Sequence, residues 1–437
     1  MTNDLHPIKF TNSTLGESYN KYSHSSGLDI YIFKKKMSSS YAIFGTKYGS
    51  VHNIFKPDGS DEFISVPDGI AHFLEHKLFA AEDGSDAFER FSEYGADANA
   101  YTSFNKTCYL FSCTKNFEDA LRELLTFVTH PHFTDENVAS EQGIIGEEIS
   151  MYDDSPYDRC FYGMLEGLFH YHSIRRNICG SRESISKITP SLLYSCYDAF
   201  YRLSNMVLVI CGDVDTDICL GIADECLGNI RDTRKPVTVK SCEKGEPVSV
   251  CKSYVEQHMQ VAKPIFKIGF KDTDIPTASA ARHRKDLSMA ILNDMIFSDS
   301  GPLYNLLVDE DMISPNLSTD YTVSEDFAFS SVSGEADDPK AVLSKVMDFI
   351  KQAKADGLSK DDFLRCKRVL YADAVRAFDS TDLIANNLFE FVCDGNELLS
   401  YTDIIESITF EEICELFSKS YRNESITLSV VLPIKSK

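Results

Sequence analysis

The second half of this sequence repeats the order of the first, and an internal repeat limits the fold more than any other feature of the chain. Three segments recur in the same order, and each is separated from its counterpart by nearly the same length of chain. One pair shares a Tyr-Arg dipeptide followed by alternating apolar residues, and another aligns without a gap, helix pattern on helix pattern. The pairs are 200–210 (FYRLSNMVLVI) with 420–430 (SYRNESITLSV), 134–155 with 359–380, and 41–50 (YAIFGTKYGS) with 263–272 (KPIFKIGFKD).

The repeat predicts two related α+β domains in tandem, at 1–230 and 251–437. The segment 231–250 between them is the predicted linker, because charged residues, proline and glycine are frequent around it. Hydrophobic periodicity in the first half predicts strands and helices in alternation. The predicted strands are 28–34, 41–48, 99–113 and 206–214, and the predicted helices are 67–80, 85–94, 117–129 and 134–152.

The charge of the chain excludes two classes of partner. Lysine and arginine number 43 against 67 aspartates and glutamates, which gives a net charge of -24. A surface this negative repels phosphate backbones and anionic lipid. We therefore expect no nucleic acid and no membrane as partners.

The cysteines and the N-terminal sequence indicate a cytoplasmic protein. The thirteen cysteines are an odd number without a CxxC pair, which is typical of reduced, mostly buried thiols. The first residues, MTNDLHPIKFTNSTLGES, lack the pattern of a secretory signal, and no run of about 18 apolar residues occurs.

A possible metal motif, HFLEH, lies in the predicted helix 67–80. Because residues four apart share one face of a helix, His72 and His76 can present two imidazoles to one ion. A catalytic zinc site uses three protein ligands, so the motif needs one more. Glu75 has the position of a general base. A string of this kind also arises by chance, so the motif alone leaves both interpretations open.

A third ligand is available in the predicted helix 134–152. Glu141 and Glu148 are seven residues apart and so lie nearly on one face, two turns from each other. Acidic residues on a helix are usually solvated, and the spacing by itself does not decide between solvent and metal.

At this point the sequence resembles the pitrilysin/insulinase family, the inverzincins, in HFLEH, NAYTSFNKTCYLF and EQGIIGEEI, taken in this order. The resemblance implies one Zn²⁺ held by His72, His76 and Glu148. It also implies Glu75 as the catalytic base and Glu141 as a carboxylate that orients a ligand imidazole. The activity that it implies is zinc-dependent hydrolysis of peptide bonds in small proteins or peptides.

The resemblance extends over nearly the whole chain. It implies two homologous α/β-sandwich domains of the LuxS/pitrilysin kind, which enclose a chamber. The second domain would lack metal, because aligning Phe79 with Phe297 places Ala290, Asn293 and Asp294 where the first half has His72, Glu75 and His76. Asp373 lies opposite Glu148.

The family binds its peptide as an added strand, which implies that Asn99 and the backbone of Ala100 contact the substrate. From the residues alone, NAYTS could equally be a plain edge strand. Within the family, GIAHFLEHKLF, GIIGEEISMYDD and SGPLY most resemble a bacterial cytoplasmic branch of YmfH-like zinc proteases. This branch implies a homodimer, or a heterodimer with a related subunit that lacks the zinc motif.

One departure from the family pattern favours a second hypothesis. Active members carry an Arg and a Tyr seven residues apart in the second half, where this chain has Val308 and Pro315. Loss of an oxyanion donor lowers a rate about a hundredfold or more. The alternative function is therefore a weakly active or non-proteolytic subunit that binds a peptide or partner subunit, associated with protein maturation or modification.

Overall fold

The computed structural model describes residues 6–82, 84–230, 236–242 and 244–434. The chain divides into two compact units, each made of separate stretches of sequence. Unit 1 contains residues 1–149, 177–243 and 375–400, and unit 2 contains residues 150–176, 244–374 and 401–437. The predicted linker 231–250 lies partly outside the described residues. The packed units follow other boundaries, so the division of the sequence into 1–230 and 251–437 stays a prediction about the repeat.

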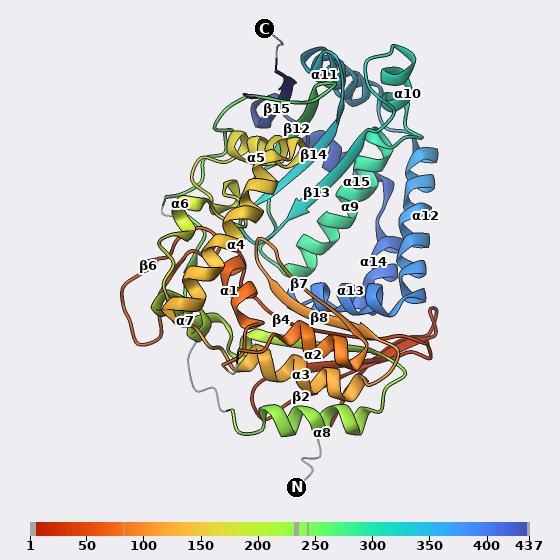
Figure 1. The fold of residues 1–437 in the computed structure, drawn as a ribbon. Coiled ribbons are helices and arrows are strands. Elements are labelled where there is room, and N and C mark those ends of the chain that lie inside the picture. Colours follow the sequence, from red (N-terminus) through yellow and green to blue (C-terminus); the bar gives the residue numbers. More distant parts are fainter. Residues whose placement is uncertain (1–5, 83, 231–235, 243, 435–437) are drawn as a thin grey trace. The chain divides into compact units, whose positions relative to one another are not determined.

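A seven-stranded sheet forms the centre of unit 1, in the order β1-β2-β3-β9-β4-β8-β7 (Figure 1). β3 runs parallel to β9, and the other neighbouring pairs are antiparallel. A small sheet in the same unit has the order β10-β5-β6. The strands are β1 Ile8–Asn12, β2 Glu17–Ser23, β3 Asp29–Lys34, β4 Ser40–Thr46, β5 Ile54–Phe55, β6 Ile64–Ser65, β7 Ala96–Thr102, β8 Thr107–Cys113, β9 Met206–Gly212 and β10 Val239–Lys240.

Unit 2 repeats the last five strands of that sheet. Its order is β11-β15-β12-β14-β13, with β11 parallel to β15 and the other pairs antiparallel. Each strand thus has a counterpart of the same direction in β3-β9-β4-β8-β7. The strands are β11 Tyr254–Met259, β12 Ile265–Asp272, β13 Ser318–Val323, β14 Ala328–Glu335 and β15 Ile426–Pro433.

The strand pairing corrects one alignment of the repeat. Tyr41 pairs with Cys211 in unit 1, and Ile265 pairs with Val431 in unit 2. β4 and β12 therefore correspond with Tyr41 aligned to Ile265, so the sequence alignment of 41–50 with 263–272 is wrong by two residues. A slip of two keeps every side chain on the same face of a strand, and so leaves the apolar pattern unchanged.

The corrected register aligns Gly45 with Gly269, and at each glycine a helix packs closely against the sheet. A Cβ atom on Gly45 would lie 2.5 Å from Cζ of Phe389, and one on Gly269 would lie 2.6 Å from Cγ of Met164. Met164 and Phe389 lie on corresponding helices, α5 and α13, which follow the aligned segments 134–155 and 359–380. The contact between sheet and helix is therefore part of the repeat.

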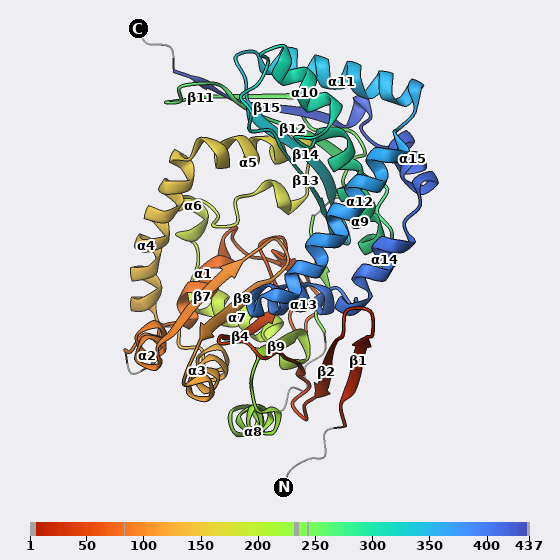
Figure 2. The same cartoon turned by 90° about the vertical axis from the view of Figure 1, so that its right-hand side faces the viewer.

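Helices cover both faces of each sheet. In unit 1, α13 packs on one face against β4 and β9, and α1 and α3 contribute to the apolar core on the other face. In unit 2, α5 packs against β12 and β15, and α9, α11 and α15 contribute to a separate core (Figure 2). The helices are α1 Ile70–Leu78, α2 Ala87–Tyr94, α3 Phe117–Thr129, α4 Asp135–Asp154, α5 Pro156–Leu168, α6 Arg182–Ile185, α7 Pro190–Phe200, α8 Thr216–Leu227, α9 Ser279–Phe297, α10 Pro302–Asp309, α11 Pro339–Asp356, α12 Lys360–Arg376, α13 Thr381–Cys393, α14 Tyr401–Ser407 and α15 Phe410–Lys419.

These elements confirm the predicted α+β class and most of the predicted elements in the first half. α2 ends before Gly95, whose φ of 70° is the left-handed conformation expected at a helix C-terminus. The prediction of one strand at 99–113 is wrong. This run forms the hairpin β7–β8, in which Thr102 pairs with Thr107. The turn between them places β7 at the edge of the sheet.

Candidate metal centre

Helix α1 carries the HFLEH motif beneath the surface of unit 1. Gly69 precedes the helix with a φ of 92°, and Ile70, Phe73 and Leu74 are fully buried on its inner side. This packing fixes the helix, so that His72 and His76 share a face, with ring centroids 4.6 Å apart. His72 is buried, and His76 is more exposed, with 25% of its side chain accessible.

Helix α4 brings Glu148 to both imidazoles. Nε2 of His72 lies 3.6 Å from Oε1 of Glu148, and Nε2 of His76 lies 3.4 Å from Oε2. Two ligand atoms bound to one tetrahedral zinc ion lie about 3.3 Å apart, since each is about 2.0 to 2.1 Å from the metal. Each imidazole therefore lies from the carboxylate at about the spacing of two ligands on one cation. The neighbouring imidazoles of His72 and then His76 also hold the pKa of Glu148 well below its usual range.

Glu141, a buried residue of α4, contacts the imidazole of His76. Nδ1 of His76 lies 3.1 Å from Oε1 of Glu141, and Nζ of Lys77 donates to Oε2 at the same distance. Burial raises the pKa of Glu141, but the contacts with His76 and Lys77 outweigh it and the pKa is lowered. An ionised Glu141 can accept the Nδ1 proton of His76, so that Nε2 would be the nitrogen that gives up its proton to a metal ion.

The negative surroundings of His76 favour a cation. Burial lowers the pKa of this imidazole, but Glu141 and then Glu148 outweigh burial and raise the pKa to about 10. The same carboxylates that stabilise a proton on the ring stabilise a divalent ion beside it. The donor set of two imidazoles and one carboxylate is also one that zinc takes in catalytic sites. The residues present therefore fit a zinc ion.

Glu75 is buried beside the ligand set. Burial raises its pKa, although the nearby imidazole of His72 and a hydrogen bond from Thr102 lower it. Oγ1 of Thr102 donates to Oε2 of Glu75 at 2.6 Å. A buried carboxylate with a raised pKa is suited to accept and return a proton near neutral pH.

The predicted substrate residues lie on the edge strand. β7 is the last strand of its sheet, and no strand within the described ranges pairs with its outer edge. Oδ1 of Asn99 accepts the backbone N–H of Ala100 at 2.9 Å, so this N–H is not used in the pairing with β8. Thr102, which contacts Glu75, ends the same strand. The structure thus links the edge of the sheet to the candidate base.

The equivalent positions of unit 2 carry no metal-binding set among the described residues. Ala290, Asn293 and Asp294 lie on α9, as the repeat predicts. Asn293 is buried, and its Oδ1 accepts a hydrogen bond from the hydroxyl of Tyr421 at 2.6 Å. Elsewhere in this unit, Val308 lies in α10 and Pro315 lies in the segment before β13.

Cys179 is the residue of this centre that the sequence did not indicate. Its Sγ lies 3.8 Å from Nε2 of His72, and the side chain is buried. Nothing in the local sequence marks it among thirteen cysteines, because it follows Glu148 at a distance and belongs to no spacing motif.

The comparisons with known proteins agree with this picture. Residues 65–180, which contain every residue of the candidate centre, match the family described as insulinase, peptidase family M16. Residues 187–370 match the family described as the peptidase M16 inactive domain. The chain is 36% identical over 431 residues to the uncharacterised zinc protease YmfH of Bacillus subtilis (strain 168), which covers 98% of this chain and 99% of that protein. This chain belongs to the insulinase (M16) peptidase family.

Two solved structures have the same fold. A crystal structure of an M16-like peptidase from Alicyclobacillus acidocaldarius superimposes with a TM-score of 0.90 at 29% identity, and covers 99% of this chain and 100% of that one. A protease from Helicobacter pylori superimposes with a TM-score of 0.82 at 16% identity, over 95% of this chain and 100% of that one, a likeness that shows the fold. The predicted family and the tandem M16 fold are therefore confirmed.

The predictions about membranes and cellular location are tested only in part. Among the described residues, no helix combines the length and apolarity that crossing a membrane requires. The cytoplasmic location and the roles of the individual site residues stay predictions.

Proposed function

We propose that this M16 family member is a zinc-dependent endopeptidase or oligopeptidase, which hydrolyses peptide bonds of small proteins or peptides. His72, His76 and Glu148 would hold the ion. The observation that supports the proposal is the approach of both Nε2 atoms to one carboxylate, at 3.6 and 3.4 Å, while Glu141 holds the far side of the second ring. Bound there, zinc would polarise the scissile carbonyl and lower the pKa of a water molecule.

Glu75 would move the proton. The hydroxyl of Thr102 holds Oε2 of Glu75, so we assign Oε1 to proton transfer. Its raised pKa lets the carboxylate take a proton from the attacking water and pass it to the amine that leaves. The burial of Glu75 also keeps bulk water from competing for this proton.

The substrate would bind as an additional strand on β7. Backbone groups on the outer edge, including the N–H of Ala100, would pair with the peptide once the amide of Asn99 moves aside. Strand addition draws affinity from main-chain hydrogen bonds and leaves preference to side-chain pockets. We also propose a cytoplasmic location and an assembly as a homodimer, or as a heterodimer with a related subunit lacking the zinc motif.

The test compares two neighbouring glutamates on α4. Glu148→Gln should lose zinc, whereas Glu147→Gln should keep it, because the side chain of Glu147 is 82% exposed and contacts Arg182 instead. Zinc is measured by mass spectrometry after purification without chelator, and cleavage is measured with a peptide library. Glu75→Gln should keep the metal and lose turnover. Cleavage at the wild-type rate by Glu75→Gln would refute the mechanism.

The second hypothesis is a zinc-binding subunit with little or no proteolysis of its own. Val308 and Pro315 favour it, because neither side chain can donate a hydrogen bond to an oxyanion. Digestion of the library with and without a candidate partner subunit distinguishes the two. Zinc without cleavage in either case favours the non-proteolytic subunit, and cleavage by the chain alone favours the peptidase.

A further inference from the structure

Cys179 contacts the candidate centre from a segment outside both ligand helices. Its Sγ lies 3.8 Å from Nε2 of His72, the nitrogen that also approaches Glu148. Within the described ranges, His72, Glu148 and Cys179 form a group of potential ligands whose donor atoms all lie within 4.8 Å of one another. His76 approaches the other oxygen of the same carboxylate, Oε2 of Glu148, at 3.4 Å.

Two glycines fix the backbone that carries this thiol. A Cβ atom on Gly69 would lie 2.4 Å from the carbonyl oxygen of Cys179, and one on Gly180 would lie 2.4 Å from that of Asp68. Both glycines have positive φ, 92° and 75°, so other residues would be strained as well as crowded. The backbone N–H of Cys179 donates to Oδ1 of Asn177 at 2.9 Å. The thiol is thus held next to the first turn of α1.

The geometry suits coordination by sulfur. A thiolate binds zinc at about 2.3 Å and an imidazole at about 2.0 to 2.1 Å, so sulfur and nitrogen on one tetrahedral ion lie about 3.6 Å apart. The observed 3.8 Å from Sγ to Nε2 is close to this value. The other ring nitrogen of His72, Nδ1, is buried without a hydrogen-bond partner in the described structure, so Nε2 is the atom that this ring offers to its neighbours.

We propose that Cys179 is a fourth protein ligand that closes the metal centre in a resting state. The proposal rests on the proposed function, since it uses the same ion. As the sulfur–metal bond forms, the thiol proton passes to solvent. Four protein ligands make a closed site of the structural kind, whereas catalysis needs one open position. Hydrolysis then requires that the sulfur takes back a proton from solvent, leaves the metal and is replaced by water.

Cobalt substitution tests this coordination directly. Co²⁺ bound to a thiolate has an intense near-ultraviolet charge-transfer band that nitrogen and oxygen ligands do not produce. We expect the band in the wild-type chain loaded with Co²⁺, and its loss in Cys179→Ser. Cys219→Ala is the matched control, because Cys219 is equally buried in unit 1, at 3% against 4% exposed, and lies on α8. A wild-type spectrum without the band would overturn the proposal.

Two further measurements do not depend on the spectrum. Cys179→Ala should weaken Zn²⁺ affinity on the order of tenfold or more, as measured by competition with a chelator. Loss of a residue that only orients a ligand already costs this much, and loss of a ligand should cost at least as much. In the unmutated chain, Zn²⁺ should slow alkylation of Cys179 relative to Cys242, as followed by peptide mass mapping. Equal affinity together with unprotected alkylation would contradict the proposal even if the variants fold poorly.

The results also separate this proposal from the proposed function. If the wild-type chain binds neither Zn²⁺ nor Co²⁺, the zinc centre itself is refuted. If metal binds and is lost in Glu148→Gln, but the sulfur band is missing, only the role of Cys179 is refuted. With the role confirmed, Cys179→Ala should also hydrolyse peptides faster than the wild type at saturating Zn²⁺.

Discussion

Units 1 and 2 share a scaffold and differ in what it carries. Five strands run in the same order and direction in both, and each sheet has a glycine where a helix packs closely. The helix that holds His72, Glu75 and His76 in unit 1 holds Ala290, Asn293 and Asp294 in unit 2. Apolar packing therefore preserves the architecture, while a few polar positions decide whether the helix offers a set of potential metal ligands.

Asp294 shows what remains of the site in unit 2. Burial raises the pKa of Asp294. The nearby guanidinium of Arg365 lowers this pKa, and the nearby carboxylate of Asp373 raises it further. Asp373 occupies the position that Glu148 has in unit 1. Without imidazoles at the other positions, the pair has no neutral nitrogen ligands for zinc.

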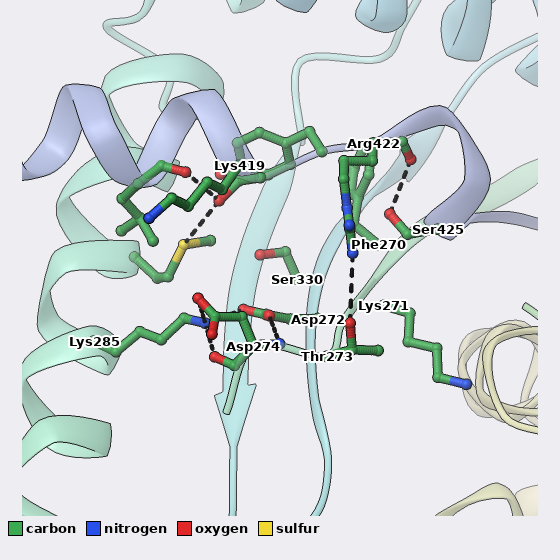
Figure 3. Close-up of a pocket in the computed structure, with 14 residues that line it drawn as sticks. Phe270, Lys271, Asp272, Thr273, Asp274, Lys285, Ser330, Lys419, Arg422 and Ser425 are labelled. Carbon is green, nitrogen blue, oxygen red and sulfur yellow. Dashed lines mark hydrogen bonds and ion pairs between the residues drawn. The ribbon is translucent and has the colours of Figure 1, made fainter. Parts of the chain in front are cut away.

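A second difference concerns the end of the sheet. In unit 1, Tyr48 stacks on Phe200 with ring centroids 4.1 Å apart, and both are buried. The corrected register and the repeat place Asp272 and Ser420 at these positions in unit 2. These two residues line a cavity of about 380 Å³ together with Lys285, Lys419 and Arg422 (Figure 3). A polar hollow thus replaces an aromatic stack.

The largest effect we expect is on stability, from Phe200→Ala. Removing a buried phenyl ring leaves a cavity and costs about 3 to 5 kcal/mol. Ser420→Ala, at the equivalent position of unit 2, should cost less than about 1 kcal/mol, because its side chain borders a hollow. Urea unfolding of the full chain measures both. Similar losses would show that the stack and the hollow contribute alike.

The next effect is on metal binding, from His76→Ala compared with Asp294→Ala. Loss of a ligand should weaken Zn²⁺ affinity by more than about 100-fold, beyond the 10- to 100-fold typical of groups that only orient a ligand. Asp294→Ala should leave affinity unchanged. Chelator competition gives both values. A comparable loss in Asp294→Ala would mean that unit 2 contributes to metal binding.

The sequence predicted what depends on spacing within an element. His72 and His76 lie four apart on a helix, and Glu141 and Glu148 lie seven apart on another, so each pair was predicted to share a face. Their convergence followed from the family resemblance. The edge position of β7 and the partner of Glu75, Thr102, depend on strand pairing and could not be read from spacing.

Other features could not be predicted for physical reasons that the structure makes plain. The slip of two residues between β4 and β12 is invisible to a pattern of period two. Cys179 reaches the centre through backbone contacts at Gly69 and Gly180, which leave no periodic signal. The assignment of α5 to unit 2 and α13 to unit 1 depends on packing between segments distant in sequence.

A smaller effect is expected from Glu141→Gln. A neutral amide can still contact Nδ1 of His76, but loses the charge that attracts both His76 and Lys77. Zn²⁺ affinity should fall about 10- to 100-fold. Cys366 occupies the equivalent position of unit 2, and Cys366→Ala should leave affinity unchanged. Unaltered affinity in Glu141→Gln would show that the charge of Glu141 is not needed to orient His76.

The smallest effect concerns pH and the hydrogen bond from Thr102 to Glu75. A general base works only when deprotonated, so kcat/KM falls as pH drops through the raised pKa of Glu75. Thr102→Val removes a contact that lowers this pKa, so the acidic limb should move to higher pH. On that limb, kcat/KM should be roughly 3- to 10-fold below wild type, which corresponds to the free energy that one hydrogen bond contributes.

Two controls decide whether this shift belongs to Glu75. Thr102→Ser keeps a hydroxyl and should leave the limb where it is. Tyr321 has the same place in the hairpin of unit 2, opposite Ser330, but donates to Asp272. Tyr321→Phe should therefore not move the limb. If Thr102→Ser shifts the limb and Thr102→Val does not, the methyl packing of Thr102, and not its hydroxyl, sets the pH dependence, and Glu75 is held by shape.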